Sequence, residues 1–266
     1  MSQIDPHYIG VFDSGIGGLS VANAIYRLLP RESIYYYADT AHVPYGPRAQ
    51  AEIRAFAEQI TQYLLDAGAK IIVLACNTAT GAALDHLRRR WPSVPFVGME
   101  PAVKPAAQAT RSGKVGVLAT QSTIHSKRYA SLMQRYAAGV EVYENPCIGL
   151  VPRIEAGQFQ HQQTKELIES IVRPMLEKGV DTLVLGCTHY PFIAPLLRQL
   201  VGPDVQLIDP APAVARQVAR RLDEAMLLVP APQQHKAEYH FYASGPLGEL
   251  DWFTDIPFIV HPPVEA

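Results

Sequence analysis

Two cysteines of the chain occupy the same position in the same local pattern. Cys76 ends the apolar run of "IIVLACNTAT", Cys187 ends that of "TLVLGCTHYP", and polar residues follow each of them. A thiolate can remove a proton from carbon and a thiol can return one. A matched pair therefore suits proton removal from one face of a carbon and delivery to the other, which would give the mirror image of the substrate. Cys147, in "NPCIGLVP", has no counterpart and is interpreted as structural.

The residues alone leave other interpretations of these cysteines open. A cysteine at a strand end is most often a small core residue, but the repetition in matched contexts favours a functional pair. A zinc site is disfavoured because one residue separates Cys187 from His189 and the chain has no CxxC motif or spaced histidine pair. A hydrolase with one cysteine nucleophile near His189 would leave Cys76 unexplained. We expect no bound metal.

A glycine-rich stretch, "FDSGIGGLS", follows the first apolar run. It lacks the lysine of a P-loop and the GxGxxG spacing, so it does not predict a nucleotide cofactor. Its glycines would let the backbone approach a ligand closely, and helix-end N–H groups would favour a carboxylate. Asp13 could cap the following helix, or it could face the ligand, orient an ammonium group or assist a thiol. Both roles fit the sequence.

The elements that must position these residues form an α/β pattern. Apolar runs such as "YIGVF" and "IIVLAC" alternate with helix-length segments such as "GGLSVANAIYRLL" and "TATGAALDHLRRR". Continuous apolar strands separated by helices predict a parallel sheet covered on both faces. Ligands bind at the carboxyl ends of such strands, where both cysteines would lie.

The pattern repeats along the chain, which predicts two similar halves. "VGVLAT" starts 106 positions after "IGVFDS" (115 minus 9), and "VEVYEN" starts 106 after "IYYYAD" (140 minus 34). The cysteines lie 111 positions apart (187 minus 76), and the prolines that end "GMEP" and "LIDP" lie 109 apart (210 minus 101). We predict two parallel-sheet α/β domains, residues 1–98 with 211–266 and residues 99–210. They would be related by a pseudo-twofold axis, with the active site in the cleft between them.

Composition and charge exclude several other classes. The net charge of -2 does not favour a nucleic-acid or membrane surface, and no apolar run approaches the roughly 20 residues of a membrane span. The start of the chain does not resemble a secretory signal. Three cysteines do not form a disulfide framework, so we expect a reducing, cytoplasmic setting with free thiols.

Five motifs together resemble a known family. They are "DSGIGG" at Asp13, "PYG" at Pro44, "ACNTAT" at Ala75, "VPRIEAG" at Val151 and "GCTHYP" at Gly186. In this order and spacing they resemble the glutamate racemases of the aspartate/glutamate racemase superfamily, over nearly the whole chain. The two cysteine motifs are the specific ones. One departure is Ser122 in "ATQST", where the family usually has glycine, although Thr120 and Thr123 remain.

The resemblance implies a cofactor-free racemase that interconverts L- and D-glutamate and supplies D-glutamate for peptidoglycan. Cys76 would take the proton from D-glutamate and Cys187 from L-glutamate, with Asp13 beside the first, His189 beside the second, and Glu155 assisting. A homodimer is also implied. The implied substrate-binding residues are Asp13, Ser14, Pro44, Tyr45, Gly46, Asn77, Thr78, Thr120, Thr123, Thr188 and His189.

The proposed bases must be thiolates, although the unperturbed pKa of a thiol is about 8.5. We expect a helix N-terminus after each cysteine, and His189 near one of them, to favour the charged form. The negative charge of Asp13 would oppose a thiolate at Cys76, so Asp13 more plausibly accepts a proton or anchors an ammonium group.

Rival functions keep part of this pattern. The same chemistry could act on aspartate, on a hydantoin, or on maleate in an isomerase. A non-catalytic two-domain amino-acid receptor would also have duplicated halves, but it would not need paired thiols. Comparing turnover of L-glutamate with that of L-aspartate would separate the first group from glutamate racemisation.

Overall fold

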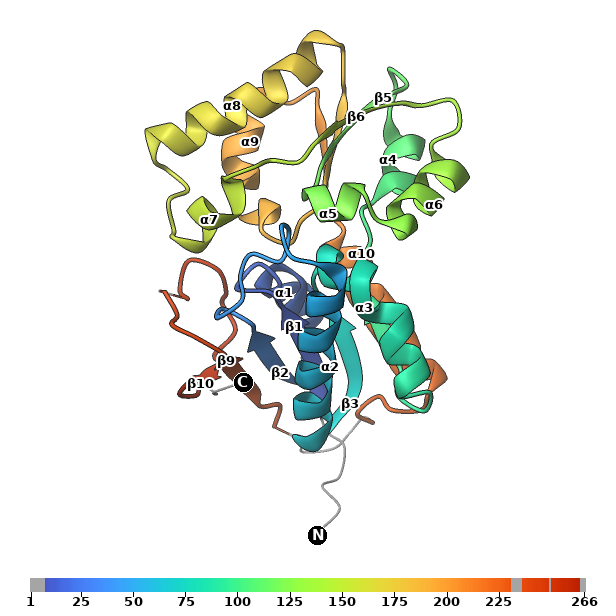
Figure 1. Cartoon of the computed structure of the whole chain (residues 1–266), viewed down its shortest axis with the longest axis vertical. Coiled ribbons are helices and arrows are strands. Elements are labelled where there is room, and N and C mark those ends of the chain that lie inside the picture. The colour runs from blue at the N-terminus through green and yellow to red at the C-terminus, as the bar shows by residue number, and fades with distance from the viewer. Residues whose placement is uncertain (1–7, 231–235, 249, 264–266) are drawn as a thin grey trace. The chain divides into compact units, whose positions relative to one another are not determined.

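The computed structural model describes residues 8–230, 236–248 and 250–263 (Figure 1). The chain divides into two compact units, one comprising Met1–Met99 with Ala211–Ala266 and the other comprising Glu100–Pro210. Each unit is built around its own sheet, and in both sheets every pairing of neighbouring strands is parallel.

The sheet of the first unit has six described strands in the order β10-β9-β2-β1-β3-β4. The central strands are buried on both faces, as their continuous apolar sequences predict; every residue of β3 is buried. β9 belongs to the end of the chain, yet it pairs with β2, and the two lie side by side in Figure 1. The strands are β1 (Tyr8–Asp13), β2 (Ser33–Ala38), β3 (Ala69–Leu74), β4 (Phe96–Gly98), β9 (Tyr239–Ala243) and β10 (Ile259–Val260).

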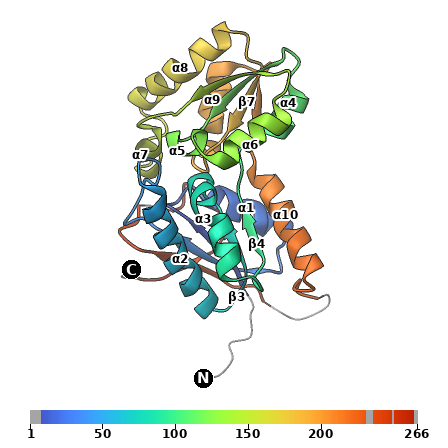
Figure 2. The same cartoon turned by 45° about the vertical axis from the view of Figure 1, so that its right-hand side comes forward.

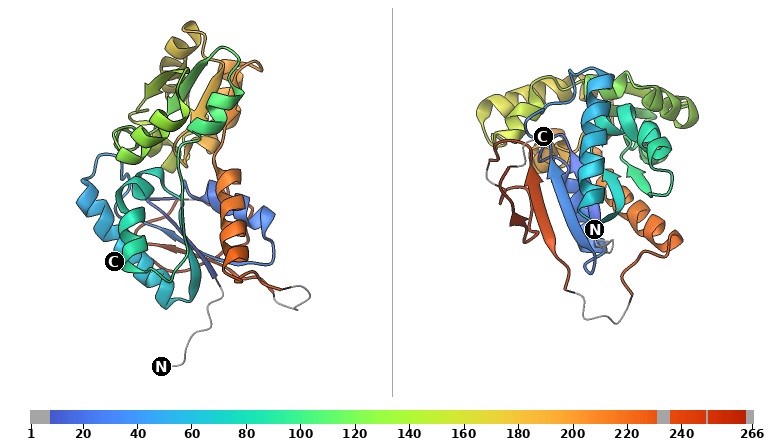
Figure 3. Two further views of the ribbon diagram at one scale, coloured as in Figure 1. Left: turned by 90° about the vertical axis from the view of Figure 1, so that its right-hand side faces the viewer. Right: turned by 60° about the horizontal axis from the view of Figure 1, so that its bottom comes forward.

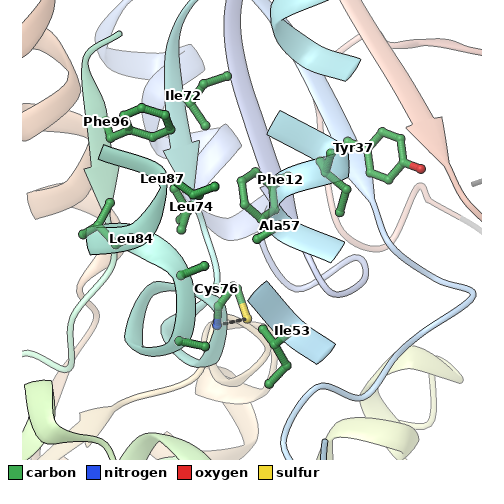
Figure 4. Packing of buried hydrophobic residues seen from close by; sticks show 14 of the residues in the cluster. Phe12, Tyr37, Ile53, Ala57, Ile72, Leu74, Cys76, Leu84, Leu87 and Phe96 are labelled. Atoms are coloured by element: carbon green, nitrogen blue, oxygen red, sulfur yellow. Dashed lines mark hydrogen bonds between the residues drawn. The ribbon is translucent and has the colours of Figure 1, made fainter. Parts of the chain in front are cut away.

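Helices cover both faces of this sheet. α2 (Gln50–Asp66) and α3 (Asn77–Arg90) pack together on one face, and α1 (Leu19–Leu28) and α10 (Ala211–Glu224) pack together on the other (Figures 2 and 3). The core between the sheet, α2 and α3 holds Phe12, Leu74 and Cys76 in one cluster of buried side chains (Figure 4). A candidate catalytic cysteine thus lies at the end of a well-packed core.

The second unit has a four-stranded sheet in the order β6-β5-β7-β8. α4 and α6 pack on one face with the apolar side chains of β5 and β7. Met175 of α8 contacts Gly116 of β5 on the other face. The strands are β5 (Lys114–Leu118), β6 (Glu141–Asn145), β7 (Thr182–Leu185) and β8 (Gln206–Ile208). The helices are α4 (Val103–Ala109), α5 (Gln121–Ile124), α6 (Lys127–Tyr136), α7 (Leu150–Glu155), α8 (Gln162–Glu177), the 3₁₀ helix η1 (Tyr190–Ile193) and α9 (Ala194–Val201).

The two sheets share one topology. The order β2-β1-β3-β4 in the first unit matches β6-β5-β7-β8 in the second, strand for strand in sequence order. The prediction of two similar parallel-sheet α/β halves is therefore confirmed. The segment "EPAVKPAAQATRSG", which begins the second unit, contains α4, and Val103 and Ala106 of this helix are buried in the core of that unit.

A buried ion pair ties the first unit together at the amino ends of its strands. Lys70 Nζ lies 2.6 Å from Glu32 Oε2, and both side chains are under 5% exposed. The pair also binds the segment that follows α10. Lys70 Nζ donates a hydrogen bond to Leu227 O, and Val229 N donates one to Glu32 Oε1. This pair fastens the part of the chain that leads to β9.

No helix within the described residues is long and apolar enough to cross a membrane.

Candidate active site

The carboxyl edge of the first sheet gathers several candidate residues. β1, β2 and β3 are neighbours in the sheet. Asp13 is the last residue of β1, and Asp39 and Cys76 closely follow β2 and β3. Because all three strands run in the same direction, their carboxyl ends meet at one edge. The sequence predicted this position for Asp13 and Cys76 but did not single out Asp39.

Cys76 caps a helix with its sulfur. It is the N-cap of the 14-residue helix α3, and its Sγ accepts a hydrogen bond from Ala79 N at 3.4 Å. Figure 4 shows this bond at the end of the core cluster. The positive end of a helix and a donated N–H both favour a thiolate over a thiol. The expected helix N-terminus after Cys76 is confirmed.

Asn77 and Thr78 form the first turn of α3 and are almost completely buried, at 6% and 5% exposure. Neither the amide oxygen nor the amide nitrogen of Asn77 has a hydrogen-bond partner within the described residues. An unsatisfied buried amide costs stability, so each such group calls for an explanation. A polar ligand beside Cys76 would supply the missing partners.

Asp13 is completely buried and binds backbone. Its Oδ2 accepts a hydrogen bond from Gly18 N at 2.6 Å, and Ser14 Oγ lies 3.5 Å from its Oδ1. Gly18 occupies the N-cap position of α1, so Asp13 is not itself the N-cap residue. Its carboxylate instead closes the turn before the helix. A side chain at position 18 would come within 2.7 Å of the Asp13 Cβ, which is why glycine stands there.

Tyr45 connects the loop after β2 to this group. Its hydroxyl donates to Asp39 Oδ2 at 2.5 Å, its ring is 1% exposed, and Pro44 and Gly46 flank it in half-buried positions. Burial raises the pKa of Tyr45, and the nearby charges of Asp39, Cys76 and Asp13 raise it further. These groups therefore surround one phenol, which stays protonated and able to donate.

The second unit holds Cys187 at the equivalent strand end. Cys187 follows Gly186, whose N–H donates to Leu118 O at 2.7 Å and where an added Cβ would lie 2.8 Å from that oxygen. Cys187 and Thr188 are 6% and 2% exposed. The predicted equivalence with Cys76 holds for the strand but not for what comes next. A 3₁₀ helix starts at Tyr190, and no α-helix begins at Cys187.

His189 and Glu155 form a hydrogen-bonded pair beside Cys187. His189 Nδ1 lies 3.5 Å from Cys187 Sγ, and Nε2 lies 2.5 Å from Glu155 Oε1, at the end of α7. Burial alone would lower the pKa of His189, but hydrogen bonds and charges from Cys187 and Glu155 raise it well above its ordinary value. A histidine with a raised pKa thus lies next to the sulfur, where a helix N-terminus was expected.

Thr120 and Thr123 lie at the carboxyl end of β5, the strand beside β7. Thr120 caps the short helix α5 by accepting from Thr123 N, and the two hydroxyls are 2.9 Å apart. Ser122, in place of the glycine usual in the resembling family, is accommodated within this helical turn.

Cys147 has a different environment from the two candidate catalytic cysteines. It is 3% exposed, its Sγ–H donates to Asn145 O, and burial raises its pKa to about 12. It remains a thiol at neutral pH, which supports a structural role. All three cysteines are free, and no cluster of three or more metal-binding side chains exists among the described residues.

Comparison with known proteins finds relatives over most of the chain. A family model described as Asp/Glu/Hydantoin racemase matches residues 9–218. A glutamate racemase of Pseudomonas paraeruginosa is 56% identical over 220 residues, which cover 83% of each chain.

Two solved structures resemble the chain closely. The glutamate racemase of Francisella tularensis in complex with D-glutamate has a TM-score of 0.77 and 34% identity, covering 91% of this chain and 90% of that one. The glutamate racemase of Escherichia coli in complex with L-glutamate and the activator UDP-MurNAc-ala has a TM-score of 0.79 and 32% identity, covering 90% of each.

Proposed function

The chain belongs to the Asp/Glu/Hydantoin racemase family, and from that premise we propose that it interconverts L- and D-glutamate with two cysteines and no cofactor. The observation that carries the proposal is the environment of the two thiols. Each cysteine follows a strand of its own sheet. Cys76 accepts a hydrogen bond from Ala79 N at the start of α3, and Cys187 lies beside His189. The relatives that bind D-glutamate and L-glutamate support this choice of substrate.

In the proposed reaction, one cysteine removes a proton from Cα of glutamate and the other cysteine donates a proton to the opposite face of the same carbon. With L-glutamate, the Cys187 thiolate removes the proton from Cα, and the electron pair stays on that carbon. The Cys76 thiol then donates its proton to the opposite face, which gives D-glutamate and a Cys76 thiolate. The reverse reaction uses the same groups with their roles exchanged.

The remaining polar residues would hold the substrate and stabilise the developing charge. Preorganised donors around the α-carboxylate make the Cα proton more acidic. Asn77 has an amide with unused donors and an unused acceptor, and Thr78 and Thr188 are buried beside the cysteines. Asp13 would bind the ammonium group, because its carboxylate lies at the same sheet edge as Cys76. His189 would exchange a proton with the Cys187 sulfur, oriented by Glu155.

As the family resemblance implies, the D-glutamate would serve peptidoglycan synthesis. A racemase of aspartate is the alternative, and the two are separated by the ratio of kcat/KM for L-glutamate to that for L-aspartate.

The test is the change in optical rotation of L-glutamate with the pure protein and nothing added. We expect decay to the racemate, and in D₂O we expect deuterium at Cα of the product. Cys76→Ala and Cys187→Ala should each lower the rate on the order of 10²–10⁴-fold or more, since each removes an acid/base group. Cys147→Ala is the matched control and should keep nearly full activity, because that thiol is buried and protonated.

The half-reactions identify which thiol faces which enantiomer. An analogue with a leaving group on Cβ needs only one base, since the electrons released at Cα form a double bond as the leaving group departs. Cys76→Ala should still eliminate from the L-analogue, and Cys187→Ala from the D-analogue. Racemisation by both single variants at the native rate would refute the two-cysteine mechanism.

A further inference from the structure

Ser244 lies beyond residues 9–218, the part of the chain that the family model matches, yet it contacts the loop that carries Tyr45. It directly follows β9, the strand from the end of the chain that pairs with β2. Its hydroxyl donates to Asp39 Oδ1 at 2.6 Å, across 205 positions of sequence. The Oγ atom of Ser244 also accepts a hydrogen bond from Ala41 N at 3.0 Å.

From this geometry we propose that Ser244 is a positioning residue for glutamate binding, acting through Asp39 on Tyr45. The proposal rests on the function proposed above, because Tyr45 and Gly46 matter here only as part of the substrate-binding loop. Within the described part of the chain, the Ser244 hydroxyl bonds to Asp39 and Ala41 and to neither candidate cysteine.

The carboxylate of Asp39 is held from two directions. Its Oδ1 accepts hydrogen bonds from Ser244 Oγ and from His42 Nδ1, the latter at 2.8 Å. Its Oδ2 accepts one from the Tyr45 hydroxyl. The Asp39 side chain is 2% exposed, so water does not replace a lost partner easily. Fixing Oδ1 from two sides sets the rotation of the carboxylate, which leaves Oδ2 directed at the phenol.

The backbone of the loop is fastened at the same point. Besides the bond from Ala41 N to Ser244, His42 N donates to Asp39 O and Arg48 N donates to Tyr45 O. Gly245 packs so closely that a side chain there would come within 3.0 Å of Ala41 N. The turn after β9 therefore packs against the start of the loop formed by residues 39–48.

The chain offers a matched control at the other end of the same strand pair. Ser33 Oγ accepts a hydrogen bond from Glu238 N and so also joins β2 to β9, but at the opposite edge of the sheet. Ser33→Ala and Ser244→Ala each remove one serine hydroxyl between the same two strands. Only the second removes a donor to Asp39.

The experiment compares Ser244→Ala, Ser33→Ala and Ser244→Thr by steady-state kinetics with L- and D-glutamate. Ser244→Ala should raise KM on the order of tenfold with a smaller change in kcat, because a hydrogen bond to a charged group is lost outside the reacting atoms. Ser244→Thr keeps the hydroxyl at a half-buried position and should restore a native KM. Ser33→Ala should leave KM unchanged.

Amide hydrogen exchange of the full-length protein supplies a readout independent of turnover. Ser244→Ala should speed exchange at Ala41, His42 and Arg48, and Ser33→Ala should not. Equal KM values for the two alanine variants would overturn the proposal, and so would unchanged exchange in the loop. If the native protein failed to racemise glutamate, the function proposed above would fail, while the exchange comparison would still decide whether Ser244 orders the loop.

Discussion

At the scale of single residues, the two candidate thiols have different neighbours. Cys76 receives an N–H at the start of a 14-residue helix, whereas Cys187 lies beside a histidine that is held by Glu155. A helix terminus is a fixed partial charge that does not titrate. A histidine titrates, so the Cys187 side of the reaction should depend on pH through His189.

The Glu155–His189 pair predicts a shift of the alkaline limb of the pH profile. Glu155 helps to raise the pKa of His189, so Glu155→Gln should lower that pKa and move the alkaline limb of kcat/KM to lower pH. Since L- and D-glutamate have equal free energies, kcat/KM must be equal in both directions, and either direction reports the shift. Glu166→Gln, on the exposed side of α8, is the control and should leave the profile unchanged. An unshifted limb in Glu155→Gln would contradict the role given to this pair.

The same pair has a consequence for stability with a definite sign. Because the pKa of His189 is raised in the folded protein, its protonation stabilises the fold below the unfolded pKa of about 6.5. That contribution is lost as the pH rises through the folded pKa.

Residue patterns could reveal the cysteines but not all of their surroundings. Cys76 is visible in the motif "ACNTAT", and Cys187 and His189 are visible together in the motif "GCTHYP". Asp39 carried a weaker signal, a carboxylate at the end of the apolar run "SIYYYAD". Its contact with Ser244 depends on the pairing of β2 with β9, and a partner 205 positions away leaves no mark in local spacing.

At the scale of elements, the strands were the most predictable part of the fold. Parallel strands buried on both faces must be continuously apolar, and β3 and β7 are buried throughout. The helix after Cys187 was less predictable, because "THYPF" is compatible with either an α-helix or the 3₁₀ turn that forms. The sequence did not predict α4, because this segment is rich in proline and small residues, and its helix is stabilised by packing in the core of the second unit.

The buried pair of Lys70 and Glu32 predicts a large stability effect. Lys70→Met should lower the free energy of unfolding by about 3–5 kcal/mol, because it leaves the Glu32 carboxylate buried without its cation. Adding Glu32→Gln should recover much of that loss while keeping an acceptor for Val229 N. Urea unfolding of the single and double variants measures both.

An exposed ion pair provides the comparison for that experiment. Arg27 and Asp255 also join α1 to the C-terminal segment, but their side chains are 69% and 90% exposed. Arg27→Met should therefore cost less than about 1 kcal/mol. A loss in Lys70→Met no larger than this would mean that the buried pair is not the fastening of the segment after α10.

At the scale of the whole molecule, the proposed mechanism requires one glutamate to engage both units. The double variant Cys76→Ala with Cys187→Ala should bind glutamate without turnover. At about 100 times its dissociation constant, the ligand should stabilise the folded protein by about 2.7 kcal/mol. Hydrogen exchange should slow both at the start of α3 and at residues 188–190, one segment in each unit. Sodium chloride at equal ionic strength is the control, and protection in one unit alone would contradict a shared substrate.

The path of the chain through the first unit also bears on its synthesis. The ribosome makes the loop that carries Tyr45 early, and it makes the hydroxyl that fastens Asp39 almost two hundred residues later, after the entire second unit. A message truncated before codon 244 would still encode all five motifs, including Cys76 and Cys187. Its product would lack the hydrogen bond from Ser244 to Asp39.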